Sequence, residues 1–415
     1  MNIIHYCFGL PPYASGGLTK YATDLFYEES KNHNVFIMLP YKYKKELRFK
    51  IKGKKILFYS SLPCSLTYGV KEPDDFIKKI NPNKFEELIK KLKIDVFHIH
   101  TIQGLYLEFL EVLKKLNVKI IFTAHDFYPI SLSSKYYLDK EKNDLNNVKL
   151  SLTCPSTKKL YLSRSPFING LKKFKFIKKI FNKKKNIDVI ITEEYKNNYL
   201  EKSKKLYDYY LKILKLCDVI HYNSKLTSDI YKKYIDVNSV IIPITHSDIK
   251  INDVKKSDSN ILRIGFFGEQ REEKGYNLLI DVLDNIDGNF KLLTYGKDNL
   301  IKRSYIDYKG PYEYDDLKDI YKNIDVVLVP STNIESFGFV VIEALANKTA
   351  VIVSNNVGSK DLVNPNYIFN NKEELSILLN NLVDDKNRLN DYFNYDLKIK
   401  SFSDHVKEVE ENLYV

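Results

Sequence analysis

The stretch that decides the fold reads Asp325-Val326-Val327-Leu328-Val329-Pro330-Ser331-Thr332-Asn333-Ile334-Glu335-Ser336-Phe337-Gly338-Phe339-Val340-Val341-Ile342-Glu343-Ala344-Leu345-Ala346. Its first five residues are an apolar run typical of a buried strand. A Pro-Ser loop follows, and residues 339–346 are then apolar nearly all round, which predicts a buried helix. A strand that leads directly into a helix is the repeating unit of a doubly wound α/β sheet.

Two carboxylates bracket the start of this helix. Glu335 lies in the preceding loop, and Glu343 lies about 10 Å further along, at about 1.5 Å per residue. Between them Ser336, Phe337 and Gly338 offer backbone N–H groups at a helix N-terminus, which is a natural seat for phosphate. Such a site suits a ligand with a diphosphate in its middle and hydroxyls at both ends, as in a nucleotide sugar. The alternative is a buried helix in which Glu343 only pairs with a neighbour.

The full string Glu335-Ser336-Phe337-Gly338 through Glu343-Ala344-Leu345-Ala346 resembles the signature of the retaining GT-B glycosyltransferases of family 4, also called group 1. The bare spacing of the two Glu is a weak signal, but the whole string after a strand and a Pro-Ser is much stronger. The resemblance covers nearly the whole chain and is weakest over residues 130–215. It implies an α/β protein of GT-B fold, with two Rossmann-like, doubly wound parallel-sheet domains that face a central cleft.

A chain of 415 residues is too long for one ordinary core, so we expect two domains. Strand-like and helix-like patterns alternate throughout, which predicts parallel sheets with helices on both faces. We expect an N-terminal Rossmann-like, acceptor-binding domain over residues 1–245 and a polar linker over 246–260. A nucleotide-sugar-binding domain should follow over 261–395. The resemblance implies that the terminal helix, within 396–415, packs back on the first domain.

The charge of +12 is unevenly distributed along the chain. Residues 1–245 hold 44 Lys and Arg against 24 Asp and Glu, a net +20, whereas the rest holds 21 against 29, a net −8. A basic first half and an acidic second half suggest different partners for the two domains. A lipid-diphosphate acceptor or anionic head groups would suit the basic half. No recognition-helix, zinc-finger or RNA-binding signature supports nucleic acid as a partner.

A basic block over residues 171–185 repeats Leu171, Phe174, Ile177 and Phe181 near helical spacing, with Lys on the other faces. This pattern fits a helix on an anionic membrane surface, and equally a solvated helix whose apolar stripe packs on its own domain. No run approaches the ~18–20 apolar residues of a membrane span.

The start of the chain reads as a strand and not as a signal peptide, and the four cysteines are scattered. We therefore expect a cytoplasmic protein, with peripheral attachment to the inner face of the plasma membrane as an option.

In the first half, polar residues gather where strands are expected to end. Gly16 and Gly17 follow the first strand, and the resemblance implies that this loop approaches the donor diphosphate. His100, His125 and Asp126 lie at the ends of two later strands, where ligands bind in such sheets. The resemblance places a His such as His125 close to the reacting carbon of the donor sugar, and it leaves His100 and Asp126 as further candidates. A zinc site formed by His98, His100 and His125 is an alternative, but no carboxylate or Cys completes the set.

In the second half, Lys274-Gly275 before an apolar helix resembles the phosphate-binding Lys of the family. The family usually places an Arg about five residues earlier, where this chain has Glu269, so we name Arg271 as a substitute. The resemblance also places base-binding groups near Tyr312. A mobile Lys charge would offset the charge of the diphosphate leaving group.

The resemblance implies a retaining transferase that moves a hexose or N-acetylhexosamine from a UDP or GDP sugar to a glycan or lipid-linked acceptor, in bacterial surface polysaccharide or glycoconjugate synthesis. Glu343 would bind the ribose, Glu335 would face the sugar, and Lys274 with the amides of residues 336–338 would stabilise the diphosphate. No Asp-x-Asp occurs, so we expect neither a metal nor another cofactor.

Two alternatives remain open at this point. One is a different enzyme on the same fold, such as an epimerase or a phosphorylase. The other is a catalytically weak subunit that supports a partner enzyme or protein acceptor, and Glu269 is the residue that keeps this interpretation open.

Overall fold

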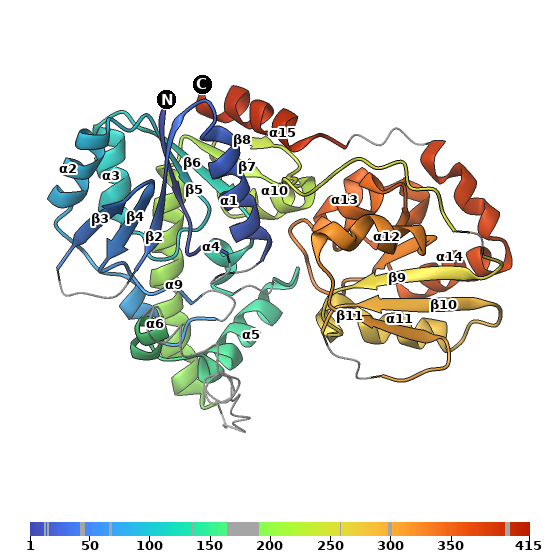
Figure 1. The fold of residues 1–415 in the computed structure, drawn as a ribbon. Coiled ribbons are helices and arrows are strands. Elements are labelled where there is room, and N and C mark those ends of the chain that lie inside the picture. The colour runs from blue at the N-terminus through green and yellow to red at the C-terminus, as the bar shows by residue number, and fades with distance from the viewer. Residues whose placement is uncertain are drawn as a thin grey trace. The chain divides into compact units, whose positions relative to one another are not determined.

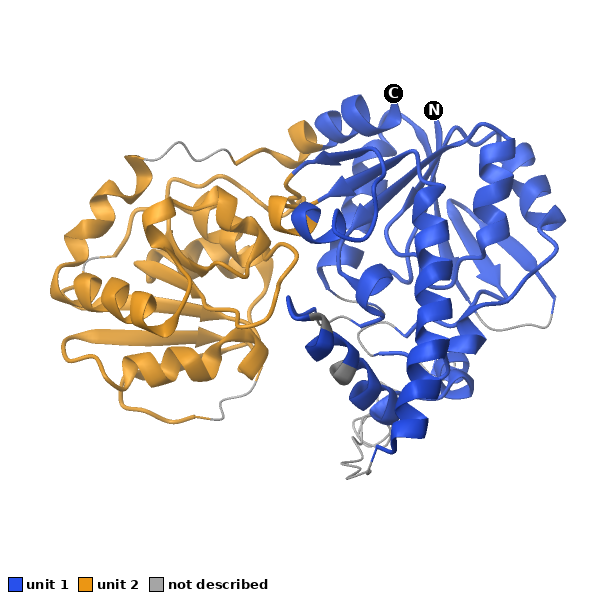
Figure 2. Ribbon diagram, turned by 180° about the vertical axis from the view of Figure 1, so that it is seen from behind, with its two compact units in different colours: residues 1–222, 228–242, 406–415 blue, residues 223–227, 243–405 orange. Residues whose placement is uncertain are grey.

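The structure is a computed structural model that describes residues 1–11, 14, 16–41, 46–65, 69–133, 136–163, 191–257, 259–297, 301–394 and 399–415. The chain divides into two compact units (Figure 2). Unit 1 comprises Met1–Tyr222, Ser228–Ile242 and Val406–Val415, and unit 2 comprises Asn223–Thr227 and Pro243–His405.

Unit 1 is built on an eight-stranded sheet with the strand order β3-β4-β2-β1-β5-β6-β7-β8 (Figure 1). All neighbours pair in parallel except β3, which runs antiparallel to β4 at the edge. The strands are β1 (Asn2–Tyr6), β2 (Asn34–Pro40), β3 (Arg48–Lys52), β4 (Lys55–Tyr59), β5 (Val96–Ile99), β6 (Lys119–Ala124), β7 (Val219–Tyr222) and β8 (Ser239–Ile241). Their central members are buried along their length, as expected of parallel strands covered on both faces.

The helices of unit 1 cover both faces of this sheet. They are α1 (Gly17–Glu29), α2 (Asn83–Leu92), α3 (Leu107–Lys115), α4 (Tyr128–Ser131), α5 (Lys140–Thr153), α6 (Thr157–Ser163), α9 (Glu193–Lys215) and α10 (Lys225–Tyr231). Alternate residues of β5 point to opposite faces. Phe97 packs against Phe85 of α2, whereas His98 lies beside Tyr414 near the end of the chain.

Unit 2 has a six-stranded parallel sheet with the order β11-β10-β9-β12-β13-β14. The strands are β9 (Leu262–Phe267), β10 (Phe290–Tyr295), β11 (Ile306–Gly310), β12 (Val326–Val329), β13 (Ala350–Ser354) and β14 (Ile368–Phe369), and the α-helices are α11 (Tyr276–Leu283), α12 (Leu317–Lys322), α13 (Phe339–Ala346) and α14 (Lys372–Asp384). The strand order reverses direction between β9 and β12, and ligands of such sheets bind at this kind of switch point. Two doubly wound α/β units confirm the expected GT-B class.

The helix at the deciding stretch is confirmed with the expected bounds. α13 follows β12, and its residues from Val341 to Ala346 are buried, because its surface is apolar nearly all round. The sheet of unit 1 was expected to be wholly parallel, and this is wrong for β3. Its sequence Arg-Phe-Lys-Ile-Lys alternates polar and apolar residues, which suits an exposed edge strand that returns through a tight turn.

Residues 246–260, the expected interdomain linker, include residues that are buried. His246, Ile249 and Val254 are buried in unit 2, and the backbone N–H of Asn252 donates to the carbonyl of Ala346. The few apolar side chains of this segment therefore anchor it to unit 2, while Lys250, Asp253 and Lys255 face solvent.

The end of the chain lies against unit 1. The helices α15 (Phe402–Val409) and η7 (Glu410–Tyr414), the second a single π-helical turn, place Val409 and Leu413 in the core of unit 1 beside Ile3 and Ala22. Unit 2 extends to His405, ten residues beyond the expected boundary at 395.

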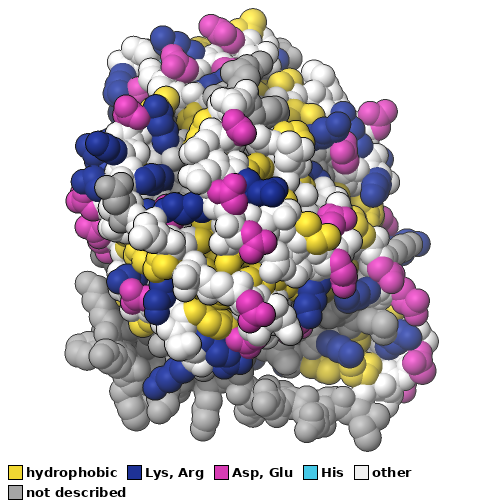
Figure 3. Space-filling view, turned by 90° about the vertical axis from the view of Figure 1, so that its right-hand side faces the viewer, with side chains coloured by type: hydrophobic (Ala, Val, Ile, Leu, Met, Phe, Trp, Pro, Cys, Tyr) yellow, Lys and Arg dark blue, Asp and Glu magenta, His cyan; other side chains and the backbone are white. Residues whose placement is uncertain are grey.

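The surface shown in Figure 3 mixes acidic and basic side chains, with hydrophobic side chains in small groups. Within the part of the chain that the structure describes, no helix has the length and apolar character needed to cross a membrane. The basic block at 171–185 lies outside the described residues, so its contact with a membrane surface stays a prediction.

Candidate functional site

The loop between β12 and α13 is held by the segment that follows β13. The backbone N–H of Glu335 donates to Asn356 at 2.9 Å, and the N–H of Gly358 donates to the carbonyl of Glu335 at 2.9 Å. A Cβ on Gly358 would lie 1.9 Å from the carbonyl oxygen of Ser336, so only glycine fits there. Close backbone packing therefore fixes the loop before any ligand binds.

The start of α13 presents backbone donors without acceptors. Gly338 has φ 100°, which only glycine adopts readily, and no side chain caps the helix. The N–H groups of Gly338 and Phe339 have no acceptor among the residues that the structure describes. The carbonyl of Ser336 accepts hydrogen bonds from the hydroxyls of Ser224 and Thr227. The N-terminus of α13 can therefore receive an anion.

Lys274 and Glu335, which lie 61 positions apart in the sequence, form an ion pair in unit 2. Lys274 Nζ lies 2.8 Å from Glu335 Oε1, and the hydroxyl of Ser331 donates to Glu335 Oε2 at 2.7 Å. Burial raises the pKa of Glu335, but the charge of Lys274 and the hydrogen bonds from Lys274 and Ser331 outweigh it, so the pKa is lowered overall. Glu335 is therefore ionised at neutral pH.

The loop that carries Lys274 packs directly on the start of the Glu335 loop. Gly275 has φ 72°, and a Cβ there would lie 1.7 Å from the carbonyl oxygen of Pro330. Glycine after the lysine therefore lets the two loops touch, and this contact brings the cation of Lys274 to Glu335.

Arg271, the substitute cation, is already paired. Its guanidinium forms a salt bridge with Glu269, the residue that stands where the family usually has Arg. Both side chains are exposed, and residues 269–274 contain three Glu against one Arg and one Lys. The two cations expected to bind a diphosphate therefore each have a carboxylate partner in this structure.

Glu343 faces the interior of unit 2 and is only 2% exposed. Its Oε1 lies 3.3 Å from His246 Nε2, while its Oε2 and His246 Nδ1 have no hydrogen-bond partner among the described residues. The ring of His246 packs against Phe339 and Tyr314. A buried carboxylate oxygen without a donor is costly and fits a site that a ligand hydroxyl completes.

His246 is a residue of this site that sequence reasoning missed. It lies in the segment interpreted as a linker, and nothing in its composition linked it to Glu343, 97 positions later. The apolar residues Ile242 and Ile244 before it, both of which are buried, were the available sign that the chain enters the interior here. Tyr312 is half-buried and packs edge-on to Phe267. Burial, and then the charge of Glu343, raise the pKa of Tyr312, so it remains a neutral phenol.

In unit 1, the Gly16–Gly17 pair marks the start of α1. Gly16 has φ 124°, and its carbonyl accepts hydrogen bonds from the hydroxyl of Thr19 and the backbone of Lys20. A Cβ on Gly16 would meet no atom within 4 Å. Glycine is therefore required here by backbone conformation and not by crowding.

His100, His125 and Asp126 lie together at the carboxyl ends of β5 and β6. His100 Nδ1 lies 3.1 Å from His125 Nε2. Burial lowers the pKa of His125 to about 3, with a smaller contribution from His221, so the ring is neutral at physiological pH. Burial raises the pKa of Asp126 to about 6, although the backbone N–H of Tyr128 donates to its Oδ1. Asp126 can therefore titrate near neutral pH.

Comparison with known proteins finds two family models that match separate parts of the chain. The model of the glycosyl transferases group 1 family matches residues 248–398, and the model of glycosyltransferase family 4 matches residues 29–160. The chain belongs to the group 1 and family 4 glycosyltransferases.

Relatives of this glycosyltransferase chain are distant. An uncharacterized 42.6 kDa protein in the cps region of Klebsiella pneumoniae is 23% identical over 381 residues, 86% of each chain. Sucrose-phosphate synthase from Thermosynechococcus elongatus is similar in structure, with a TM-score of 0.55 at 15% identity over 100% of this chain and 96% of that one. Anabaena Alr3699/HepE in complex with UDP gives 0.53 at 13% identity, over 100% and 96%. These structural similarities support the GT-B fold.

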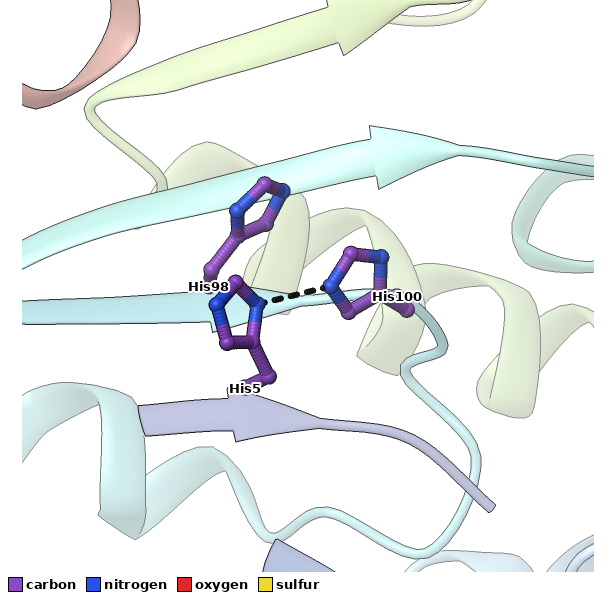
Figure 4. Close-up of side chains that lie close together, drawn as sticks. All are labelled: His5, His98 and His100. Carbon is purple, nitrogen blue, oxygen red and sulfur yellow. Dashed lines mark hydrogen bonds between the residues drawn. The ribbon is translucent and has the colours of Figure 1, made fainter. Parts of the chain in front are cut away.

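Three histidines of this glycosyltransferase lie close together, namely His5, His98 and His100 (Figure 4). Their nearest ring nitrogens lie within 4.8 Å of one another, and all three rings are buried. Each ring nitrogen already has a partner: Glu29 and His100 for His5, Tyr414 and Thr123 for His98, His5 and His125 for His100. A metal ion would have to displace several of these bonds. The set considered for zinc from the sequence was His98, His100 and His125. In the structure His100 and His125 contact each other, whereas His98 is bonded to Tyr414 and Thr123.

Proposed function

We propose that the protein is a retaining glycosyltransferase that moves a hexose or N-acetylhexosamine from a UDP- or GDP-linked donor to a glycan or lipid-linked acceptor. The observation that carries the proposal is the arrangement of Lys274, Glu335 and the free N–H groups of Gly338 and Phe339 around one loop of unit 2. A cation and unpaired amides are the groups that stabilise a departing diphosphate.

The proposal assigns each residue a task. Lys274 would leave Glu335 and bind the diphosphate, which frees Glu335 to accept hydrogen bonds from the sugar hydroxyls. Glu343 would bind the ribose through its unpartnered Oε2, and Tyr312 would lie near the base. His125 would line the sugar pocket, and the loop at Gly16 and Gly17 would approach the diphosphate. No step requires a metal ion, because amides and Lys274 supply the positive charge.

Two further parts of the proposal concern the biological setting. The UDP complex of Anabaena Alr3699/HepE supports a nucleotide-diphosphate sugar as the donor class. The relative in the cps region supports a role in bacterial polysaccharide or glycoconjugate synthesis. The net charge of +20 over residues 1–245 supports a cytoplasmic protein that contacts an anionic membrane surface or lipid-diphosphate acceptor.

The test is release of nucleoside diphosphate from a panel of UDP and GDP sugars, with and without EDTA. We expect release from one donor class, unchanged by EDTA, and an anomeric proton with the donor's configuration in the NMR spectrum of the product. Glu335→Gln should lower this release at least tenfold, because the amide cannot replace a carboxylate at the sugar. Equal turnover in Glu335→Gln and the native protein would refute the role of Glu335.

A second candidate function rests on the salt bridge between Arg271 and Glu269. If Glu269 keeps Arg271 from the diphosphate, the chain would bind a nucleotide weakly and act as a support for a partner enzyme or protein acceptor. Nucleotide binding without donor turnover, in the presence of any acceptor of the panel, would favour this alternative.

A further inference from the structure

A continuous chain of buried groups leads from α1 to His125 in unit 1. Glu29 Oε2 lies 2.7 Å from His5 Nε2, His5 Nδ1 lies 3.0 Å from His100 Nε2, and His100 Nδ1 lies 3.1 Å from His125 Nε2. Glu29 and His5 are fully buried, His100 is 1% exposed and His125 is 9% exposed. Figure 4 shows the bond between His5 and His100 and, beside it, the ring of His98. Only the last member of this relay approaches the surface.

A second branch starts from the other oxygen of Glu29. The hydroxyl of Tyr414 donates to Glu29 Oε1 at 2.8 Å and lies 2.8 Å from His98 Nδ1. His98 Nε2 lies 2.7 Å from Thr123 Oγ1, which lies 3.0 Å from His221 Nδ1, and His221 Nε2 donates to the carbonyl of Ile242. The register explains the assembly: His5 pairs with His98, and Thr123 with His221, on one face of adjacent strands.

The donors of the relay can be assigned by counting protons. A neutral imidazole has one N–H and one acceptor nitrogen. Burial, then the neighbouring histidines, lower the pKa of His100, and burial lowers that of His125, so both rings are neutral. If Glu29 is a carboxylate, His5 Nε2–H donates to it, His100 Nε2–H donates to His5 and His125 Nε2–H donates to His100. His125 Nδ1 then carries a lone pair.

While Glu29 is ionised, the network named above is one hydrogen short at Tyr414. The hydrogen-bond contacts named above number eight, three in the relay and five in the second branch. With Glu29 ionised, the five imidazoles of the relay and the second branch, Thr123 and Tyr414 supply seven hydrogens for these eight contacts, because Tyr414 has one hydrogen for both Glu29 and His98.

We infer that Glu29, His5 and His100 form a proton relay that takes up a proton at His125 and stores it at Glu29. A hydroxyl bound at His125 would give its proton to Nδ1. The Nε2 proton of His125 would pass to His100 Nδ1, that of His100 to His5 Nδ1, and that of His5 to Glu29 Oε2. Every N–H bond that breaks is replaced by one that forms on the other nitrogen of the same ring, and the carboxylate becomes a carboxylic acid.

The inference rests on the proposed function for the source of the proton, which is a sugar hydroxyl bound at His125. Within the relay only His125 would touch the substrate. His100, His5 and Glu29 are positioning residues that act through His125. Other titratable groups face the network: Tyr21 lies edge-on to His100 and His125, and Glu408 of α15 and Glu410 of η7 act on His221 and Tyr414 through their charge.

Glu29→Gln separates this role from a structural one. Its amide oxygen can accept from His5 while its amide N–H donates to Tyr414, whose hydroxyl then donates to His98. All eight contacts are then satisfied with every group neutral, so the variant should fold and bind UDP or GDP as the native protein does. It cannot store a proton, so we expect kcat to fall about 10²-fold with little change in KM, and the pH profile to lose one ionisation.

The matched control is Glu28→Gln on the same helix, whose carboxylate pairs with Lys31 at the surface. It makes the same chemical change one residue away and should leave kcat and the pH profile unaltered. A native kcat and pH profile in Glu29→Gln, beside measurable turnover of the native protein, would overturn the inference.

NMR tests the relay without turnover. The chain has eight histidines, so ring ¹⁵N spectra of a histidine-labelled sample are tractable. At pH 8 we expect His5, His100 and His125 as Nε2–H tautomers in the native protein and in Glu29→Gln. A neutral His125 that carries its proton on Nδ1, or a stoichiometric zinc ion on His5, His98 and His100 in the purified protein, would contradict the relay. These results stand even if no donor sugar is turned over.

Discussion

At the residue scale, the clearest consequence comes from Glu269, which stands where the family usually has Arg. Because Glu269 pairs with Arg271, Glu269→Gln should release the guanidinium for a diphosphate. Exposed ion pairs contribute about 0.2–1 kcal/mol, so we expect UDP or GDP to bind up to about fivefold more tightly by calorimetry. Glu272→Gln removes the same charge from the same loop without an ion pair to Arg271 and is the control. Equal gains in both variants would show that only net charge matters.

Asp126 gives a pH-dependent prediction. Its pKa of about 6 in the folded protein lies above its ordinary value of 3.8, so ionisation destabilises the fold. The loss of unfolding free energy caused by this ionisation is absent below pH ~4, grows as the pH rises, and is constant above pH ~6. Asp126→Asn should therefore gain roughly 1–2 kcal/mol of unfolding free energy over the native protein between pH 5 and pH 8, measured by urea unfolding. A difference that does not change with pH would contradict the raised pKa.

Sequence patterns predicted the local structure around Glu335 well, because a strand, a loop and a helix that are adjacent in sequence stay adjacent in space. They did not predict the pairing of Lys274 with Glu335, or of His246 with Glu343, since each joins segments 61 and 97 positions apart. The histidine network is the extreme case, because Tyr414 and Glu29 lie 385 positions apart. Only the spacing of His98 and His100 hinted at it.

At the element scale, the fold was predictable because the strands are short apolar runs that alternate with helical patterns. α1, α13 and most parallel strands lie within one or two residues of their expected bounds. The exceptions are segments whose burial depends on a partner. Edge strand β3 is mostly polar, and 246–260 buries only a few apolar side chains against unit 2.

The contact between the Lys274 loop and Pro330 can be tested at Gly275. Gly275→Ala would place a Cβ 1.7 Å from the carbonyl oxygen of Pro330, so the loops must separate. We expect a loss of more than about 3 kcal/mol in the free energy of unfolding, or a loss of nucleotide binding if the loop moves instead.

Gly310→Ala is the matched control for this contact. Gly310 also has a positive φ, 82°, but its Cβ would meet no atom within 4 Å. It should cost only the left-handed strain of about 1–2 kcal/mol. Equal losses in the two alanine variants would mean that crowding at Pro330 contributes nothing.

At the scale of the whole molecule, the buried histidines predict acid lability. Burial lowers the pKa of His125 to about 3 and that of His221 to about 4, and it lowers those of His98 and His100 further from 6.5. The contribution of these neutral rings to the free energy of unfolding is complete above pH 6.5. It is lost as the pH falls toward 3–4, at up to about 1.4 kcal/mol per pH unit for each ring. The raised pKa values of the carboxyls of Asp126, Glu108 and Glu410 act in the opposite direction.

Unfolding in urea at pH 7.5, 6.5 and 5.5, followed by circular dichroism, measures this loss; the chain has 32 Tyr and no Trp, so tyrosine emission is a second signal. His221→Gln should have a shallower pH dependence than the native protein. A native stability that is constant from pH 6.5 to 5.5 would show that these rings are not held neutral.

The central claim is that the β12–α13 loop binds the diphosphate of a nucleotide sugar. It is tested most directly by the thermal unfolding of the full chain with UDP, GDP and their sugars, in the native protein and in Glu343→Gln. We predict that one nucleotide raises the melting temperature, with stabilisation of about 2.7 kcal/mol at 100 times its dissociation constant, and that Glu343→Gln weakens this effect. No shift with any of these nucleotides in the native protein would contradict the account.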